Sequence, residues 1–294
     1  MREQLQKWLS GQKTELPQMS DANISEVRLR DVIKPIPIEQ VLSSATVVSE
    51  VFLRGSSNKV YILSLDDFNQ GIFKPKEGEI QVRKEIKSGT HYKRERAAYL
   101  VDRFLGLGLV PPTIIREHDG KNGSLQERMN FKVAGYATLK SDRVMIKDEM
   151  IKMWLFDYII WNSDRHDGNW LMGNNGVYAI DNGCSFVPES FLRVYHNYFG
   201  ETIPQEFRQK ILDFQDWDSG KDTLHAVLSE LLSEKEVDAC LARIDVLGNY
   251  LKKHNAILKE DFDKIVENMR HFVTGVGNSW TSNNMEIEEY HFEE

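Results

Sequence analysis

The chain has 294 residues, of which 41% are hydrophobic and 28% charged. This balance is typical of a globular protein and is long enough for one two-lobed domain or two modest ones. The net charge of −8 argues against a general nucleic-acid binder, because such proteins usually carry an excess of Lys and Arg.

The two cysteines, Cys184 and Cys240, have no spacing typical of a metal site or a disulfide framework. We expect both to be small buried residues in a reducing compartment. The first residues lack the apolar core of a signal peptide, and the most apolar run, residues 153–161, contains Asp157 and is too short to span a bilayer. We therefore expect a cytoplasmic protein without integral membrane association, with non-classical secretion as an effector left open.

The first half of the chain predicts a small strand-rich lobe. Residues 1–40 are polar and indicate an N-terminal extension or linker, in which Pro35 and Pro37 favour an extended connector. From there the pattern of apolar residues and turns predicts three strands, a helix and two further strands, at residues 46–53, 60–65, 72–74, 92–105, 113–115 and 126–131. Strands followed by one helix and more strands suit a small α+β lobe, which we place at residues 41–135.

The second half predicts a mainly helical lobe at residues 136–280. Residues 150–161 are apolar on nearly all faces, which indicates a buried helix, and two short strands follow at 170–172 and 177–180. Three apolar stripes at helical spacing occupy the C-terminal third. The expected fold class is thus α+β, with a strand-rich N-lobe, a helical C-lobe and a cleft between them. Five of the last nine residues are Glu, and we expect residues 281–294 to be a disordered acidic tail.

A pattern typical of phosphoryl transfer follows the buried helix. This chemistry needs a carboxylate that receives or orients a proton, and oxygen ligands that hold Mg²⁺ against phosphates. In protein kinases one loop supplies an Asp and, five residues later, an Asn, and a strand then ends in Asp-x-Gly. Asp164 and Asn169 have the same spacing, and Asp181-Asn182-Gly183 follows a predicted hairpin. The alternative is that these residues only form turns.

Lys74 adds to this pattern from the small lobe. It ends an apolar strand, where its ammonium group would point into the lobe interface and need an anionic partner. The phosphates of ATP and the carboxylate of Glu95, on the following predicted helix, would both serve. The alternative is a solvated lysine at a strand end. The turn at residues 55–59 has small residues that would let backbone N–H groups approach a phosphate, although most such turns are only hairpin turns.

Together these motifs resemble the phosphatidylinositol 3- and 4-kinase superfamily, in particular its bacterial branch near actin-fragmin kinase and the type II phosphatidylinositol 4-kinases. The resemblance covers about residues 50 to 190. It is carried, in chain order, by Phe73-Lys74-Pro75, by Arg94-Glu95-Arg96-Ala97-Ala98-Tyr99, by residues 105–113, by Gly123-Ser124-Leu125-Gln126, by Asp164-Arg165-His166 with Asn169, and by Ile180-Asp181-Asn182-Gly183.

The resemblance implies a two-lobed protein-kinase-like fold that binds ATP and Mg²⁺ or Mn²⁺. Lys74 would then hold the α- and β-phosphates and pair with Glu95. Asp164 would orient or deprotonate the acceptor hydroxyl, and His166 would assist it. Asn169 and Asp181 would be the metal ligands.

The remaining implied contacts concern the nucleotide. Ser56, Ser57 and Asn58 would cap the phosphates. The segment that contains Gln126, Glu127 and Met129 would lie at the adenine and bind it through backbone hydrogen bonds.

We therefore expect an ATP- and Mg-dependent kinase. A protein hydroxyl is favoured as the acceptor over an inositol lipid, because the chain is acidic and shows neither a strongly amphipathic membrane helix nor a polybasic patch. The alternatives are a phosphoinositide kinase, a small-molecule kinase, a nucleotide-binding pseudokinase that acts as a scaffold, and an AMP transferase. The acceptor, the oligomeric state and the role of both termini do not follow from the sequence.

Overall fold

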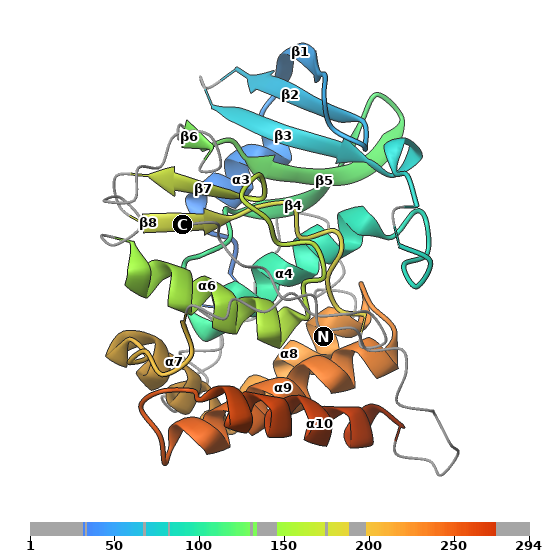
Figure 1. The fold of residues 1–294 in the computed structure, drawn as a ribbon. Helices are drawn as coiled ribbons and strands as arrows, with labels where there is room; N and C mark the ends of the chain where they lie inside the picture. The colour runs from blue at the N-terminus through green and yellow to red at the C-terminus, as the bar shows by residue number, and fades with distance from the viewer. Residues whose placement is uncertain are drawn as a thin grey trace, which may run out of the picture.

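The computed structural model describes residues 32, 34–66, 69–81, 83–129, 132–133, 146–173, 176–187 and 198–274. A five-stranded antiparallel sheet lies at one end of the molecule and a group of helices at the other, with α4 between them (Figure 1). The elements are α3 (Pro37–Ser44), β1 (Val47–Leu53), β2 (Val60–Leu65), β3 (Gln70–Pro75), the 3₁₀ helix η1 (Lys76–Gly78), α4 (His91–Leu105), β4 (Thr113–His118), β5 (Lys121–Glu127), β6 (Lys132–Val133), α6 (Lys147–Ile160), β7 (Trp170–Gly173), β8 (Gly176–Ala179), α7 (Gln205–Gln215), α8 (Gly220–Ser229), α9 (Glu234–Leu251) and α10 (Lys259–Thr274).

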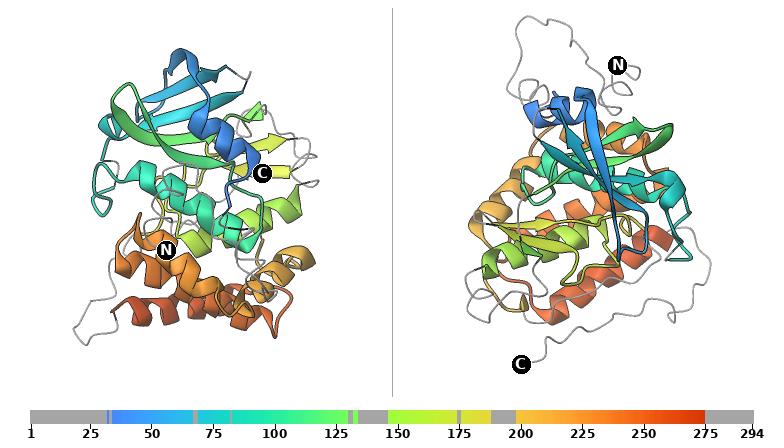
Figure 2. Two further views of the ribbon diagram at one scale, coloured as in Figure 1. Left: turned by 180° about the vertical axis from the view of Figure 1, so that it is seen from behind. Right: turned by 90° about the horizontal axis from the view of Figure 1, so that it is seen from above.

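The sheet of the small lobe has the order β1-β2-β3-β5-β4. Its inner face forms a small apolar core that consists of Leu42, Leu63, Leu65, Phe73, Ile114 and Leu125. Leu42 belongs to α3, which lies across the sheet in the view from behind (Figure 2). Side chains alternate between the two faces of a strand, so Phe73 enters this core and its neighbour Lys74 points to the opposite face.

The turn between β1 and β2 lies at the same end of the sheet as Lys74. Tyr61 of β2 pairs with Phe73 of β3, so the preceding residue, Val60, is in register with Lys74. The backbone N–H of Lys59 donates to the carbonyl of Gly78, just beyond β3. The expected phosphate-binding turn is therefore next to the end of β3.

The predicted strands and helices are largely confirmed, with one strand misplaced. The helix predicted at 92–105 is α4, and the buried helix predicted at 150–161 is α6. The strand predicted at 126–131 was wrong, because β5 runs from Lys121 to Glu127. The reason is a tight turn at Asp119-Gly120, where both residues have positive φ (51° and 70°) and reverse the chain directly after β4. Residues 130 and 131 lie outside the described residues.

Two helices were not predicted, α3 and α7. Ile36 is extended, as expected, but Pro37 begins α3, because proline is tolerated at the first helical position. Glu39 of α3 is 2% exposed and forms ion pairs with Arg96 and Arg103 of α4. Helix α3 thus begins before residue 41 and contacts α4, while the boundaries of the lobes stay a prediction.

The large lobe has one extended apolar core, built from α4, α6 to α10 and the hairpin of β7 and β8. Trp154, Trp161 and Trp170 are buried in it. Cys184 and Cys240 are free and buried, as expected. Within the described residues, we find no helix that is both long and apolar enough to cross a bilayer. The segment before residue 32 and the acidic tail lie outside the described residues.

A buried carboxyl group predicts a pH dependence of stability. Asp102 of α4 is 2% exposed and accepts a hydrogen bond from the backbone N–H of Leu109 (2.9 Å). Burial raises the pKa of Asp102 from 3.8 to about 7. The native state therefore holds this proton more tightly than the unfolded state, so the contribution of Asp102 to stability is complete below pH 4 and is lost as the pH rises toward 7.

We therefore expect Asp102→Asn, which keeps an acceptor for Leu109, to flatten the decline in the free energy of unfolding between pH 4 and pH 7. Urea denaturation at several pH values measures this. An equal decline in the wild type and the variant would contradict the assignment.

Candidate active site

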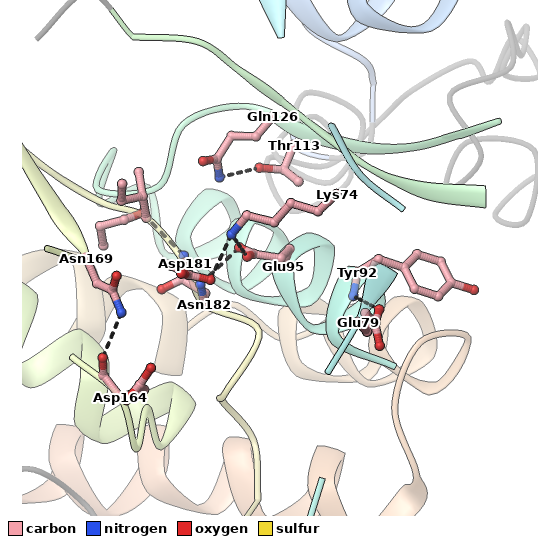
Figure 3. Close-up of polar contacts among 12 residues, drawn as sticks. Lys74, Glu79, Tyr92, Glu95, Thr113, Gln126, Asp164, Asn169, Asp181 and Asn182 are labelled. Carbon is pink, nitrogen blue, oxygen red and sulfur yellow. Dashed lines mark hydrogen bonds and ion pairs between the residues drawn. The ribbon is translucent and has the colours of Figure 1, made fainter. Parts of the chain in front are cut away.

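Three elements that are distant in the sequence meet at the ammonium group of Lys74 (Figure 3). Its Nζ lies 2.5 Å from Oε1 of Glu95, on α4, and 2.8 Å from Oδ1 of Asp181, after β8. The Lys74 and Glu95 side chains are 18% and 3% exposed, whereas that of Asp181 is 42% exposed. The predicted pair of Lys74 with Glu95 is thus present, and Asp181 joins it.

The charges of this cluster support one another. Burial lowers the pKa of Lys74, but Asp181 and Glu95 outweigh burial and hold this pKa above its usual value. In turn, the ammonium group of Lys74 lowers the pKa of Asp181 against the effect of burial. At neutral pH the ammonium group of Lys74 and the carboxylate of Asp181 are therefore both charged.

The backbone around Asp181 brings its carboxylate to this place. Asp181 has φ of 56°, in the left-handed region that Asp adopts more readily than most residues. The next backbone N–H, that of Asn182, donates to Oε2 of Glu95 (3.0 Å). A Cβ on Gly183 would lie 3.1 Å from Cβ of His91, so glycine permits the close approach of this loop to α4. Glu95 thus holds Lys74 with one oxygen and the loop with the other.

The second half of the site is the loop between α6 and β7. The side-chain N–H of Asn169 donates to the backbone carbonyl of Asp164 (2.9 Å), which turns Oδ1 of Asn169 away from Asp164 (Figure 3). The backbone N–H of Ile180 donates to the carbonyl of Asn169 (3.1 Å), which holds this loop to the strand that leads to Asp181. Nδ1 of His166 accepts the backbone N–H of Gly168 (3.0 Å).

A buried arginine that was not predicted from the sequence underlies both loops. Arg165 is fully buried and pairs with Asp157 of α6 (2.9 Å). It also donates to the carbonyls of Asn169 and Ile180 and to the side chain of Asn182 (2.6 Å). Asp157 was the available signal, because a charged residue inside an otherwise apolar helix requires a buried partner.

A second arginine contacts the predicted catalytic carboxylate. Arg83 lies between η1 and α4 and donates to Oδ1 of Asp164 (3.3 Å) and to the carbonyl of Ser163 (3.1 Å). Nearby, Ile86 packs against Cys184 and Val187 in a small apolar cluster. Arg83 was not predicted, because no residue near it in the sequence indicates a contact with Asp164, about 80 positions away.

The predicted adenine segment continues from β5. The side chain of Gln126 is buried and donates to the hydroxyl of Thr113 (2.9 Å). The N–H of Glu127 donates to the carbonyl of Pro112 (2.8 Å), but Pro112 has no N–H to return to the carbonyl of Glu127. This missing ladder bond fits an acceptor for an external donor. Met129 follows two residues later and is half-buried.

The predicted phosphate turn is less closely tied to the cluster. Ser56 and Ser57 are exposed, and Oδ1 of Asn58 accepts the backbone N–H of Ile80 (2.8 Å). Among the residues that the structure describes, no hydrogen bond or ion pair joins Ser56, Ser57 or Asn58 to Lys74. Their role toward phosphates stays a prediction.

The chemistry of the donors fits a hard divalent cation. The ionised carboxylate of Asp181 offers oxygen ligands of the kind that Mg²⁺ and Mn²⁺ take. So does Oδ1 of Asn169, which points away from Asp164. In the described part of the chain, no group of three or more His, Cys, Asp or Glu side chains could hold a metal ion. A cation here would need further oxygens from phosphates or water, as Mg²⁺ usually does.

Comparison with known proteins shows the fold and not the family. No family model matches the chain. Protein Rv2133c of Mycobacterium tuberculosis is 28% identical over 180 residues, which cover 49% of this chain and 64% of that protein. The chain therefore spans less than two thirds of this relative.

Among solved structures, the Golgi casein kinase is similar with a TM-score of 0.50 at 14% identity, over 84% of this chain and 96% of that one. A second structure of the Golgi casein kinase, with Mn and ADP bound, gives a TM-score of 0.48 at 14% identity, over 79% of this chain and 80% of that one. The chain has an α+β, two-lobed, protein-kinase-like fold. The narrower resemblance to the phosphatidylinositol kinase branch is not confirmed and stays a prediction.

The buried ion pair under the loops predicts a large loss of stability on substitution. Arg165→Met leaves the carboxylate of Asp157 buried without its partner, and we expect the free energy of unfolding to fall by about 3–5 kcal/mol. Lys210→Met, which removes a more exposed pair with Glu206 on α7, is the control and should cost much less. Urea denaturation compares the two, and equal losses would show that Arg165 does not support the loops.

Proposed function

We propose that this chain is an ATP- and divalent-metal-dependent kinase of the phosphatidylinositol 3-/4-kinase-like type that phosphorylates a protein hydroxyl. The observation that carries this proposal is the position of Lys74 Nζ between the carboxylates of Glu95 and Asp181. In protein kinases, a lysine that is paired with a helix carboxylate binds phosphates, and an Asp close to that lysine binds the metal ion. An arrangement that served stability alone would not need the second carboxylate to be 42% exposed.

The residues divide the work by their chemistry. Lys74 would bind the α- and β-phosphates of ATP, and Glu95 would orient it. Asp181 and Asn169 would hold Mg²⁺ or Mn²⁺, which when bound neutralises charge on the phosphates. Ser56, Ser57 and Asn58 would cap the phosphates from the turn between β1 and β2. Pro112 has no N–H that could donate to the carbonyl of Glu127. This carbonyl would therefore accept a hydrogen bond from the amino group of adenine.

Asp164 would act on the acceptor. Its carboxylate would accept a hydrogen bond from the acceptor hydroxyl and receive the proton as the oxygen attacks the γ-phosphorus. The bond between the γ-phosphorus and the β,γ-bridging oxygen breaks, ADP leaves with that electron pair, and a phosphate ester forms. His166, two residues further on and half-buried, would assist by stabilising charge.

Three observations support a protein as the acceptor. The chain is acidic overall, and no described helix is apolar enough to cross a bilayer. A kinase of inositol lipids would need cations to meet the headgroup at an anionic membrane surface. The Golgi casein kinase, the neighbour whose fold this chain shares, is by its name a kinase of a protein.

Labelling with γ-³²P ATP tests the proposal. We expect the wild type to label itself or casein without lipid, and Asp181→Ala to reduce labelling by at least about 100-fold, because a metal ligand is lost. Asp218→Ala, which removes an exposed carboxylate between α7 and α8, is the control and should leave labelling unchanged.

The other outcomes identify the alternatives. Labelling of anionic vesicles that collapses with salt would indicate a lipid kinase. Labelling from α-³²P ATP instead would indicate AMP transfer. Stabilisation by Mg-ATP without any turnover would indicate a nucleotide-binding scaffold. Each of these results would overturn the proposed protein kinase activity.

A further inference from the structure

Helix α4 shares its apolar core with the large lobe. Its buried residues, among them Ala97, Leu100 and Phe104, belong to the same continuous cluster as α6 and α9. Phe104 stacks on Trp217, after α7, with ring centroids 5.8 Å apart. None of the six residues that form the small core of the sheet comes from α4. The helix that carries Glu95 is therefore part of the apolar core of the large lobe.

An arginine next to Glu95 strengthens this attachment. Arg94 is 4% exposed and donates with Nη1 to the carbonyl of Ser185 (2.6 Å) and with Nη2 to Oε1 of Glu236 (2.5 Å). Glu236 lies in the first turn of α9, where its Oε2 also accepts the N–H and the hydroxyl of Ser233 (2.9 and 2.8 Å). Arg94 thus joins α4 both to the cap of α9 and to the segment after Gly183.

The contacts of α4 with the small lobe are of another kind. Arg96 pairs with Glu39 of α3 (2.7 Å) and donates to the carbonyl of Thr113 at the start of β4. These contacts are polar. They are made by Arg96, which directly follows Glu95, whereas Arg94 directly precedes it. A guanidinium bonded to two acceptors at once leaves a buried charge unpaired if the helix moves away, and this is costly.

We propose that Arg94 is a positioning residue that fixes α4 to the large lobe through Glu236 and Ser185. Glu95 then stays beside the ammonium group of Lys74 and the backbone of Asn182. The site is assembled in this way without covalent modification of the chain. The inference concerns Arg94 and Glu236, and its link to catalysis rests on the proposed kinase function.

Hydrogen exchange of the nucleotide-free full chain tests the attachment directly, whatever the activity is. We expect backbone amides of α4 to exchange with the opening free energy of α9, and those of β2 and β3 to exchange faster. In Glu236→Gln, which preserves the cap because glutamine also accepts from Ser233, protection in α4 should fall while α6 is unchanged. Exchange of α4 together with the sheet would overturn the proposal.

Steady-state kinetics tests the link to nucleotide use. We expect Glu236→Gln to lower kcat/KM for ATP about tenfold, mainly through a higher KM. The reason is that α4 would no longer hold Glu95 in place beside Lys74. Glu234→Gln, an exposed residue in the same turn of α9, is the matched control and should change neither parameter. Arg94→Lys keeps the charge but loses the two-acceptor fork, and should resemble Glu236→Gln.

A double-mutant cycle separates positioning from general destabilisation. If Glu236 acts through Glu95, the effect of Glu236→Gln on KM should largely disappear in a Glu95→Gln background. Full additivity, or a loss of activity in Glu236→Gln with KM unchanged, would contradict positioning. Absence of ATP turnover in the wild type would overturn the proposed function instead, while the exchange result would still decide whether α4 belongs to the large lobe.

Discussion

An ammonium group enclosed by two carboxylates is the interaction on which this site depends. A buried lysine needs anionic partners, and Lys74 finds them on elements that follow it by 21 and 107 positions. Each partner is placed by a different rule. Strand alternation turns Lys74 away from the core that contains Phe73, α4 presents Glu95, and a left-handed backbone presents Asp181. If Lys74 did not reach this place, the two carboxylates would be left without compensation.

A second polar cluster, around the fully buried Arg165, keeps the loops in place. Arg165 binds the carboxylate of Asp157, the side chain of Asn182 and the carbonyls of both loops. Such a network is favourable only when each member is bonded, so it specifies one arrangement of the loops. Asp164 and Asp181 can then remain partly exposed, because the backbone that carries them is held from beneath by Arg165.

The sequence predicted this site where the chemistry is local and missed it where long-range contacts decide. The spacing of Asp164 and Asn169, and the strand end at Asp181, were sufficient to place the loops. The pairing of Lys74 with Glu95 followed from the cost of an unpaired charge. The position of β5 was wrong because the Asp119-Gly120 turn was overlooked. By contrast, no local pattern marks Arg83, or joins Arg94 to Glu236 across 142 positions.

The charge balance of the cluster explains why a site of this kind can be stable before it binds anything. Two carboxylates alone would repel each other, and each would take up a proton more readily. Lys74 prevents this, since its ammonium group lowers the pKa of Asp181 and keeps this carboxylate ionised. Glu95 is the more deeply buried carboxylate, and it also accepts the N–H of Asn182. Glu95 is therefore the fixed partner of Lys74, and Asp181 is the one that can exchange the ammonium group for another cation.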